Sequence, residues 1–169
     1  DARRLLALST AMAVDPELFK QGLRRWASGV TVVTTKSGDK PHGMTVSAFS
    51  SVSADPPLVL VCANRNSRTH AVIREGGRFT VNVLASDQQD VSAVFSSSKL
   101  EDSRFDHVAW RPGLGGVPLI DGALVNLECR VEHSHDHGSH TIYIGYVEVA
   151  HVADKRPLLY YDGAYRDVG

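Results

Sequence analysis

Residues 124–152 read LVNLECRVEH-SHDHGS-HTIYIGYVEVAHV and contain the clearest β-hairpin signal of this 169-residue chain. Two runs rich in Val, Ile and Tyr, residues 124–133 and 140–152, flank a polar tip near Asp136-His137-Gly138. β-Branched and aromatic residues favour strands, and a short polar segment with glycine favours the turn that joins them. The stretch therefore predicts two antiparallel strands with a tight connection.

Further short strands are predicted on both sides of this hairpin. They are the β-branched or apolar runs at residues 30–35, 44–52, 58–62, 79–84 and 158–161. Turn residues separate them at 36–41, at Asp55-Pro56-Pro57 and at 113–118. No Gly-x-Gly-x-x-Gly stands between a strand and a helix, so a Rossmann unit is not expected. Many short strands with few helices predict a mainly β fold, an antiparallel barrel rather than a doubly wound parallel sheet.

Three helices interrupt the strands. Asp15 followed by Pro16 is a favourable start, and apolar residues then recur at helical spacing until Gly29. A second helix is predicted to follow Ser67, and a third lies between Asp87 and Phe95. These helices are short, so the strands are expected to dominate the core.

Length and composition predict one domain, residues 15–169, preceded by a leader or tail at residues 1–14. The net charge of -1, with Lys and Arg interspersed among acids, gives no reason to expect a nucleic-acid partner. No apolar run approaches the roughly 20 residues that span a bilayer, so no membrane partner is expected either. Cys62 and Cys129 lie in strand-like runs and are expected to be buried free thiols, which suit a reducing cytoplasm.

The first candidate site is the run Gly43-Met44-Thr45-Val46-Ser47-Ala48-Phe49, with Ser50, Ser51 and Ser53 beyond it. A planar heterocycle such as isoalloxazine needs an apolar wall and a row of hydrogen-bonding groups along its edge. Small hydroxylated residues after a glycine could supply that edge. An ordinary strand rich in Ser and Thr is the alternative interpretation.

The second candidate site is the run Cys62-Ala63-Asn64-Arg65-Asn66-Ser67-Arg68-Thr69. A strand is expected to end here, and Ser67 is a suitable N-cap for the following helix. Free amides at a helix start, two hydroxyls and two guanidiniums would form a phosphate site in a surface loop. A solvated strand-to-helix loop with an N-cap is the alternative.

The third candidate is a group of histidines, His133, His135, His137 and His140, around the hairpin tip. Alternating histidines share one face of a strand, which is a pattern that metals use. No carboxylate or thiolate completes a familiar ligand spacing, so no metal site is expected. His140 differs from the others because it opens the return strand.

In their order and spacing these segments resemble the flavin reductase-like family, the small reductase components of two-component flavin-dependent monooxygenases. The resemblance covers Phe19 to Tyr165. It is carried by residues 26–34, 43–53, 55–59, 78–84 and 157–161, together with Ser67-x-Thr69 and Gly138-Ser139-His140 leading to Gly145.

The resemblance implies a split β-barrel that forms a homodimer and binds FMN or FAD in a groove near the dimer interface. Residues 44–48 would line the isoalloxazine, residues 62–69 would contact the ribityl chain and phosphate, and Val94-Phe95 would approach the flavin. His140 matches a histidine near the nicotinamide of NADH or NADPH. Many members have Gly-Asp-His where this chain has Gly138-Ser139-His140, which leaves open what orients His140.

The implied reaction is hydride transfer from the nicotinamide to the flavin, with the reduced flavin passed to a partner monooxygenase. The cofactors supply the chemistry, and the protein holds the two rings at reacting distance. Two alternatives stay open at this point. One is a non-enzymatic flavin- or haem-binding module on the same scaffold, and the other is an enzyme of the pyridoxine-phosphate oxidase type with a tightly bound flavin.

Overall fold

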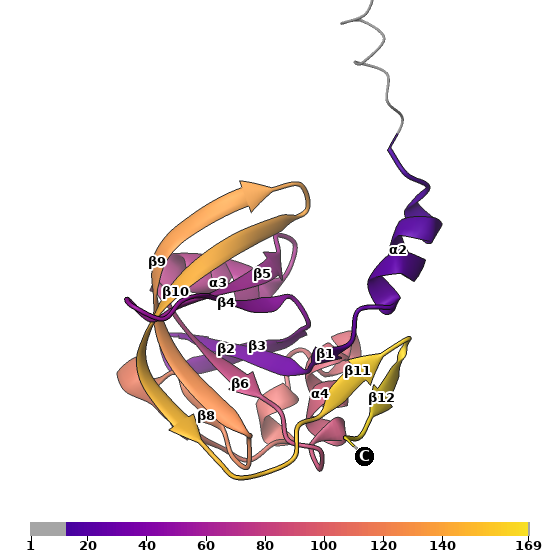
Figure 1. The fold of residues 1–169 in the computed structure, drawn as a ribbon. Coiled ribbons are helices and arrows are strands. Elements are labelled where there is room, and N and C mark those ends of the chain that lie inside the picture. Colours follow the sequence, from indigo (N-terminus) through magenta and orange to yellow (C-terminus); the bar gives the residue numbers. More distant parts are fainter. Residues whose placement is uncertain (1–12, 169) are drawn as a thin grey trace, which may run out of the picture.

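Figure 1 shows the computed structural model, which describes residues 13–168. Almost all of the expected leader, residues 1–14, lies outside this range. The main element is a seven-stranded antiparallel sheet in the order β3-β2-β6-β9-β10-β5-β4. Its strands are β2 (Thr31–Ser37), β3 (Lys40–Val46), β4 (Phe49–Ser53), β5 (Leu58–Asn64), β6 (Arg78–Val83), β9 (Val125–His137) and β10 (His140–Val152). The sheet is strongly curved along its width, as Figure 1 shows. The predicted mainly β, antiparallel fold is confirmed, and the open curl is consistent with a split barrel.

The long hairpin β9–β10 confirms the strand pair predicted from residues 124–152. The turn itself is only Gly138 and Ser139, with Gly138 at a φ of 56°, so β9 continues to His137 beyond the expected tip. Residues of β10 alternate between the two faces of the sheet. Thr141, Tyr143 and Gly145 are buried on the inner face, whereas His140 and the residues at every second position after it point outward.

The single strand predicted at residues 44–52 is wrong. The chain leaves the sheet at Ser47 and Ala48, between β3 and β4. β3 pairs with β2, and β4 pairs with β5 at the opposite edge of the sheet. A single strand cannot pair at both edges of the sheet. The small residues 47–48 therefore form a link that connects β3 at one edge to β4 at the other.

The helices begin where the capping residues predict. Asp15 accepts hydrogen bonds from the first-turn amides of α2 (Pro16–Arg24), which ends well before the expected Gly29. Ser67 caps α3 (Arg68–Gly76), and α4 comprises Gln89–Ser96. The smaller elements are β1 (Ser28–Gly29), β11 (Leu159–Tyr161) and β12 (Ala164–Arg166) in one sheet, β7 (Trp110–Pro112) and β8 (Pro118–Ile120) in another, and the 3-10 turns Ser98–Leu100, Arg104–Asp106 and Leu114–Gly116.

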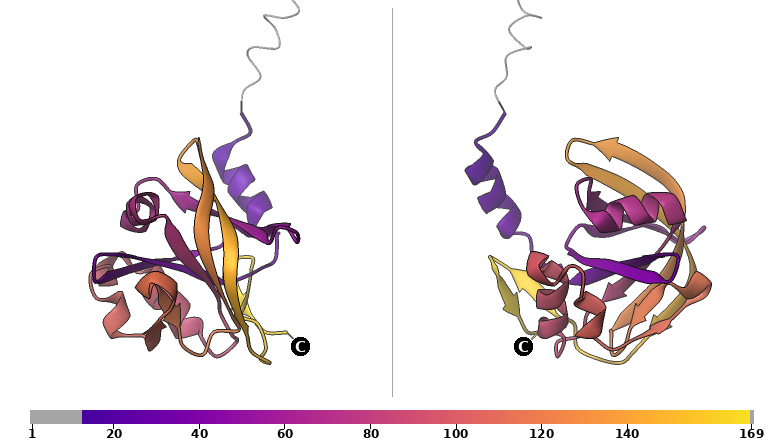
Figure 2. Two further views of the ribbon diagram at one scale, coloured as in Figure 1. Left: turned by 90° about the vertical axis from the view of Figure 1, so that its left-hand side faces the viewer. Right: turned by 180° about the vertical axis from the view of Figure 1, so that it is seen from behind.

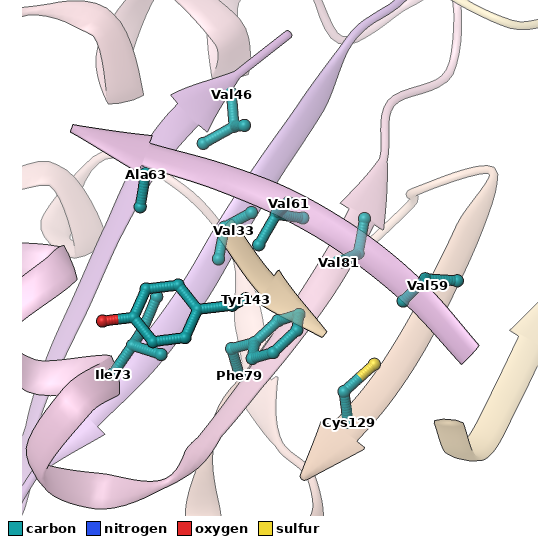
Figure 3. Packing of buried hydrophobic residues seen from close by; sticks show 10 residues of the cluster. All are labelled: Val33, Val46, Val59, Val61, Ala63, Ile73, Phe79, Val81, Cys129 and Tyr143. Atoms are coloured by element: carbon teal, nitrogen blue, oxygen red, sulfur yellow. The ribbon is translucent and has the colours of Figure 1, made fainter. Parts of the chain in front are cut away.

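Two hydrophobic clusters form the core. The larger one lies inside the curled sheet, where the Tyr143 ring packs close to Ile73 and Phe79 (Figure 3). The second cluster consists of Val30, Val32, Leu84, Phe95, Ile120 and Leu158. Burial in the larger cluster raises the pKa of the Cys129 thiol to about 12. Cys129 and the half-buried Cys62 are both free, as expected.

Helix α2 contributes no buried residue to either cluster. Its apolar side chains Leu18, Phe19 and Leu23 are 59%, 55% and 58% exposed. The right-hand view of Figure 2 shows the helix standing apart from the barrel. Its amphipathic sequence therefore presents an apolar face that the rest of residues 13–168 leaves exposed. None of the helices formed by residues 13–168 combines the length and apolar character that crossing a bilayer requires.

Candidate flavin and nicotinamide site

The structure brings the two predicted binding runs and His140 together across neighbouring strands. The carbonyl of Ala48 accepts a hydrogen bond of 3.0 Å from the amide of Cys62. One strand further, Cys62 lies opposite Ile142, and Asn64 lies opposite His140. The β3–β4 link, the end of β5 and the start of β10 therefore adjoin one another, although they are far apart in the sequence.

An apolar groove of about 380 Å³ adjoins the β3–β4 link. Ser47 and Ala48 line it, and the aromatic rings of Trp26, Phe49 and Tyr160 line it with them. An apolar, aromatic wall with a few polar groups at its edge is the usual lining of a site for a planar heterocycle. The residues of the groove therefore fit a flavin ring, and Trp26 and Tyr160 are lining residues that neither candidate run included.

The remaining residues of the first run lie deeper than the groove. Gly43 and Val46 are buried, whereas Met44 and Thr45 are half-buried. The Thr45 hydroxyl donates to the carbonyl of Ser92 on α4, at 2.9 Å. Met44 and Val46 pack in or against the larger core cluster and Thr45 ties β3 to α4, so these side chains hold β3 in place.

Gly43 is required by a close approach of aromatic rings. A Cβ atom at this position would lie 2.8 Å from Cε1 of Phe95 and 3.2 Å from Cζ of Phe105. Phe95 is 1% exposed and belongs to the second core cluster, with Val94 packed against that cluster. Phe95 therefore packs against β3 from the core side, and its buried ring does not line a ligand site.

Arg104 is a buried residue that no sequence pattern marks as part of the site. Its Nη1 donates to the carbonyl of Gly43 at 2.7 Å, and its Nη2 donates to the carbonyl of Ser97 at 3.0 Å. Its Nε–H is buried and has no hydrogen-bond partner among residues 13–168, and burial lowers the pKa of the guanidinium. Arg104 therefore ties the start of the first run to the end of α4. A lone Arg at the start of a 3-10 turn carries no pattern that would reveal this contact.

The second run forms the strand-to-helix connection that its sequence predicts. The Ser67 hydroxyl accepts from the amide of His70 at 3.1 Å and donates to the carbonyl of Asn64 at 2.8 Å. The expectation that both hydroxyls lie in a surface loop is wrong for Thr69, which is 3% exposed on α3, because the helix begins one residue earlier at Arg68. Ala63 is likewise a core residue, 1% exposed.

Arg68 has carboxylate partners outside the run. Its Nη1 lies 2.5 Å from Oδ1 of Asp102, and its Nε lies 3.7 Å from Oε2 of Glu101. Half-buried His42 lies near the same charges, and burial, followed by Lys40 and Arg68, lowers its pKa. A phosphate that contacts Arg68 would therefore meet a mixed cluster of charges and not an isolated cation.

The four histidines lie on one outer face of the hairpin. In the β9–β10 register, His133 lies opposite Ile144, His135 opposite Ile142 and His137 opposite His140. Cross-strand partners share a face of the sheet. The rings of His133 and His135 stack with centroids 6.2 Å apart. All four side chains are exposed, and His137 belongs to β9 and not to the tip. Among residues 13–168, no three His, Cys, Asp or Glu side chains are arranged to hold a metal ion.

Comparisons with known proteins agree with this geometry. Residues 23–169 match the family described as "Flavin reductase like domain". An NADH-dependent flavin reductase from a Rhodococcus species is 44% identical over 166 residues, which cover 94% of this chain and 92% of the relative.

Solved structures give the same result. Nitrilotriacetate monooxygenase component B from Mycobacterium thermoresistibile superposes with a TM-score of 0.87 at 38% identity, covering 92% of this chain and 88% of that one. The NADH:FAD oxidoreductase of Streptomyces globisporus, solved with NAD and FAD fragments, gives a TM-score of 0.86 at 34% identity over 94% and 98% of the two chains. The chain therefore belongs to the flavin reductase-like domain family.

Proposed function

We propose that this protein is an NAD(P)H-dependent flavin reductase that reduces FMN or FAD and supplies the reduced flavin to a partner monooxygenase. One observation carries the proposal. Ser47 and Ala48 line an apolar, aromatic groove, and hydrogen-bonded strand neighbours connect this groove to Cys62 and to His140. The relatives named above are reductases or monooxygenase components by their descriptions. The aromatic groove can hold the flavin ring, and the exposed imidazole of His140 lies on a neighbouring strand. This arrangement can place the nicotinamide ring next to the flavin ring.

The residues of the site have distinct roles in this proposal. Trp26, Phe49 and Tyr160 provide the apolar wall for the flavin ring, and the backbone of residues 44–48 provides hydrogen bonds along its edge. The connection from Cys62 to Thr69 holds the ribityl phosphate, chiefly through Ser67 and Arg68. His140 orients the nicotinamide. When both cofactors are bound they supply the hydride transfer itself, and the chain needs no general base for it.

NADH oxidation by the purified protein tests this function. We expect a nearly colourless preparation that oxidises NADH only when FMN or FAD is added. A preparation that holds flavin or haem through gel filtration, and that does not accelerate NADH oxidation by added flavin, would contradict the proposal. That result would favour the binding-module or tight-flavin alternatives. Parallel assays with NADPH, and with each flavin, establish the preferred pair.

A homodimer is part of the same proposal. The exposed apolar face of α2, formed by Leu18, Phe19 and Leu23, adjoins the groove because Leu23 also lines it. Apolar side chains gathered on one helix and left exposed by the described part of the chain favour association, and twofold dimers are the commonest outcome. A second subunit on this face would close one side of the flavin groove.

We also propose a single domain over residues 15–169 and a cytoplasmic location. The two free thiols support the location.

A further inference from the structure

Two histidines on the outer face of the β9–β10 hairpin have no role in the proposed reaction. His133 and His135 are two positions apart on β9, so their side chains point to the same side of the sheet. Their rings lie with centroids 6.2 Å apart and with an angle of 26° between the ring planes. Both side chains are exposed. Two neighbouring imidazoles that solvent can reach are a pair of ligands that a metal ion can share.

The ring nitrogens of this pair are available to a ligand. Among residues 13–168, the imidazole hydrogen bonds belong to His70, His140 and His151. An imidazole nitrogen that carries no proton is a metal ligand, and the second nitrogen of the same ring can keep the proton. A metal ion at His133 and His135 therefore displaces water and no contact within the described part of the protein.

The strand holds the two rings close to a chelating geometry. A tetrahedral ion bound about 2.0–2.1 Å from one nitrogen of each ring requires ring centroids about 5 Å apart. The observed 6.2 Å is only slightly wider, and small rotations about the torsions of two exposed side chains remove the difference. The backbone beneath them is fixed, because His133 and His135 lie opposite Ile144 and Ile142 in the β9–β10 register. Ligands on a strand are placed more precisely than ligands on a loop.

The ligand type selects the class of metal. Imidazole suits Zn²⁺, Ni²⁺ and Cu²⁺, whereas Mg²⁺ and Ca²⁺ prefer oxygen ligands. From the sequence no metal site is expected, because no carboxylate or thiolate completes a familiar ligand set, and the stacking of the two rings is visible only in the folded chain. Since residues 13–168 bring no three such ligands together, the remaining coordination positions belong to water.

We propose that His133 and His135 together bind one divalent transition-metal ion of the Zn²⁺, Ni²⁺ and Cu²⁺ class. The site is open to solvent and exchanges its ion, unlike a closed structural zinc site with four protein ligands. It is separate from the proposed nicotinamide position, because His140 lies at the end of the other strand and its Nδ1 contacts the Ser139 hydroxyl.

Ni²⁺ is a suitable probe, because it binds imidazole and its unpaired electrons broaden the NMR signals of its ligands. We expect calorimetric titration of the protein without an affinity tag to show Ni²⁺ binding. The affinity should fall roughly tenfold or more in His133→Gln and in His135→Gln, because one imidazole alone cannot chelate the ion. His107→Gln is the matched control, since His107 is also exposed but follows the 3-10 turn Arg104–Asp106. The control should bind Ni²⁺ as the wild type does.

NMR signals of the imidazole ring protons identify the ligands independently of any substitution. With Ni²⁺ at less than one equivalent, the signals of His133 and His135 should broaden first, while that of His107 stays sharp. No Ni²⁺ binding by the wild type, or equal affinity in His133→Gln, His135→Gln and His107→Gln, would overturn the inference. A loss of affinity in His137→Gln with none in His133→Gln would overturn it too, because that result assigns the ion to the cross-strand pair of His137 and His140.

Discussion

The hydroxyl oxygen of Ser139 lies 2.8 Å from Nδ1 of His140. Many members of the family have an aspartate where this chain has Ser139, so the carboxylate that could orient the imidazole is replaced here by a hydroxyl. A serine hydroxyl can donate to Nδ1 or accept from it, and either arrangement leaves Nε2 directed away from the turn. The contact fixes the ring without adding a negative charge beside the proposed nicotinamide site.

We predict that His140→Ala slows flavin reduction roughly tenfold or more, because the nicotinamide loses the group that orients it. Flavin affinity should change little, since the aromatic groove is intact. Anaerobic stopped-flow measurement of flavin bleaching over a range of NADH concentrations checks this. His133→Ala is the control, because His133 shares the same outer face but contacts neither the turn nor the groove. Equal reduction rates in His140→Ala and the wild type at every NADH concentration would show that His140 is structural.

Arg104 is predicted to position the flavin-binding strand. Arg104→Gln should lower the free energy of unfolding by roughly 2–5 kcal/mol, because the carbonyls of Gly43 and Ser97 lose buried, charged donors. The affinity for FMN should fall as well, since β3 and α4 are no longer tied together. Urea unfolding and fluorescence titration with FMN measure the two effects. Arg104→Lys should recover part of each, and a variant with unchanged stability and FMN affinity would refute the assigned role.

The stability of the protein should fall in mildly acidic solution because of His70. Burial, with Arg74 acting in the same direction, lowers the pKa of His70 below its ordinary value of 6.5. The unfolded chain therefore binds more protons than the folded protein once the pH drops below 6.5, and folding loses free energy as acid is added. The Thr141 hydroxyl is the main cause that lowers the pKa of Asp136. Protonation of this carboxylate therefore reduces the stability of the folded protein only below its ordinary pKa of 3.8.

Urea midpoints measured between about pH 7.5 and about pH 5 test this prediction. His70→Asn should reduce the slope of stability against pH over that range. Part of the slope should remain, because the pKa of His42 is lowered in the same direction by burial. A slope in His70→Asn as steep as that of the wild type would exclude His70 as its source.

The uncovered face of α2 predicts a dimer that a single charge can weaken. Leu23→Glu places a carboxylate among Leu18 and Phe19, on a face proposed to be buried between subunits. Sedimentation velocity at micromolar concentration should show a wild-type dimer and a monomeric or weakened variant. Glu17→Gln, on the same helix but outside its apolar face, serves as the control. A wild-type protein that sediments only as a monomer would refute the dimer.

Local signals in the sequence account for much of the fold. The caps at Asp15 and Ser67 predict the starts of α2 and α3, and the alternation after His140 predicts the longest strand pair. These features depend on neighbours in the chain, so a single sequence reveals them. The break at Ser47 and Ala48 depends instead on which strand each half pairs with. A continuous run of β-formers carries no sign of that choice.

The site was predictable only in outline. The structure places the runs beginning at Gly43 and Cys62 beside one another and beside His140, and their role as binding residues stays a prediction. Thr69 is buried, and Phe95 and Arg104 lie against Gly43 from positions 52 and 61 residues away in the sequence, so these features come from tertiary packing. No local pattern encodes such contacts.

Reduction of free FMN by NADH under anaerobic conditions tests the central claim most directly. The measurement mixes the purified protein with FMN and NADH in a stopped-flow spectrophotometer and follows the visible absorbance of the flavin and the near-ultraviolet absorbance of NADH. We predict that both bands disappear together, in equimolar amounts and at a rate proportional to the protein concentration. Bleaching no faster than in a mixture without protein, with either NADH or NADPH and with either FMN or FAD, would contradict the claim that this chain is a flavin reductase.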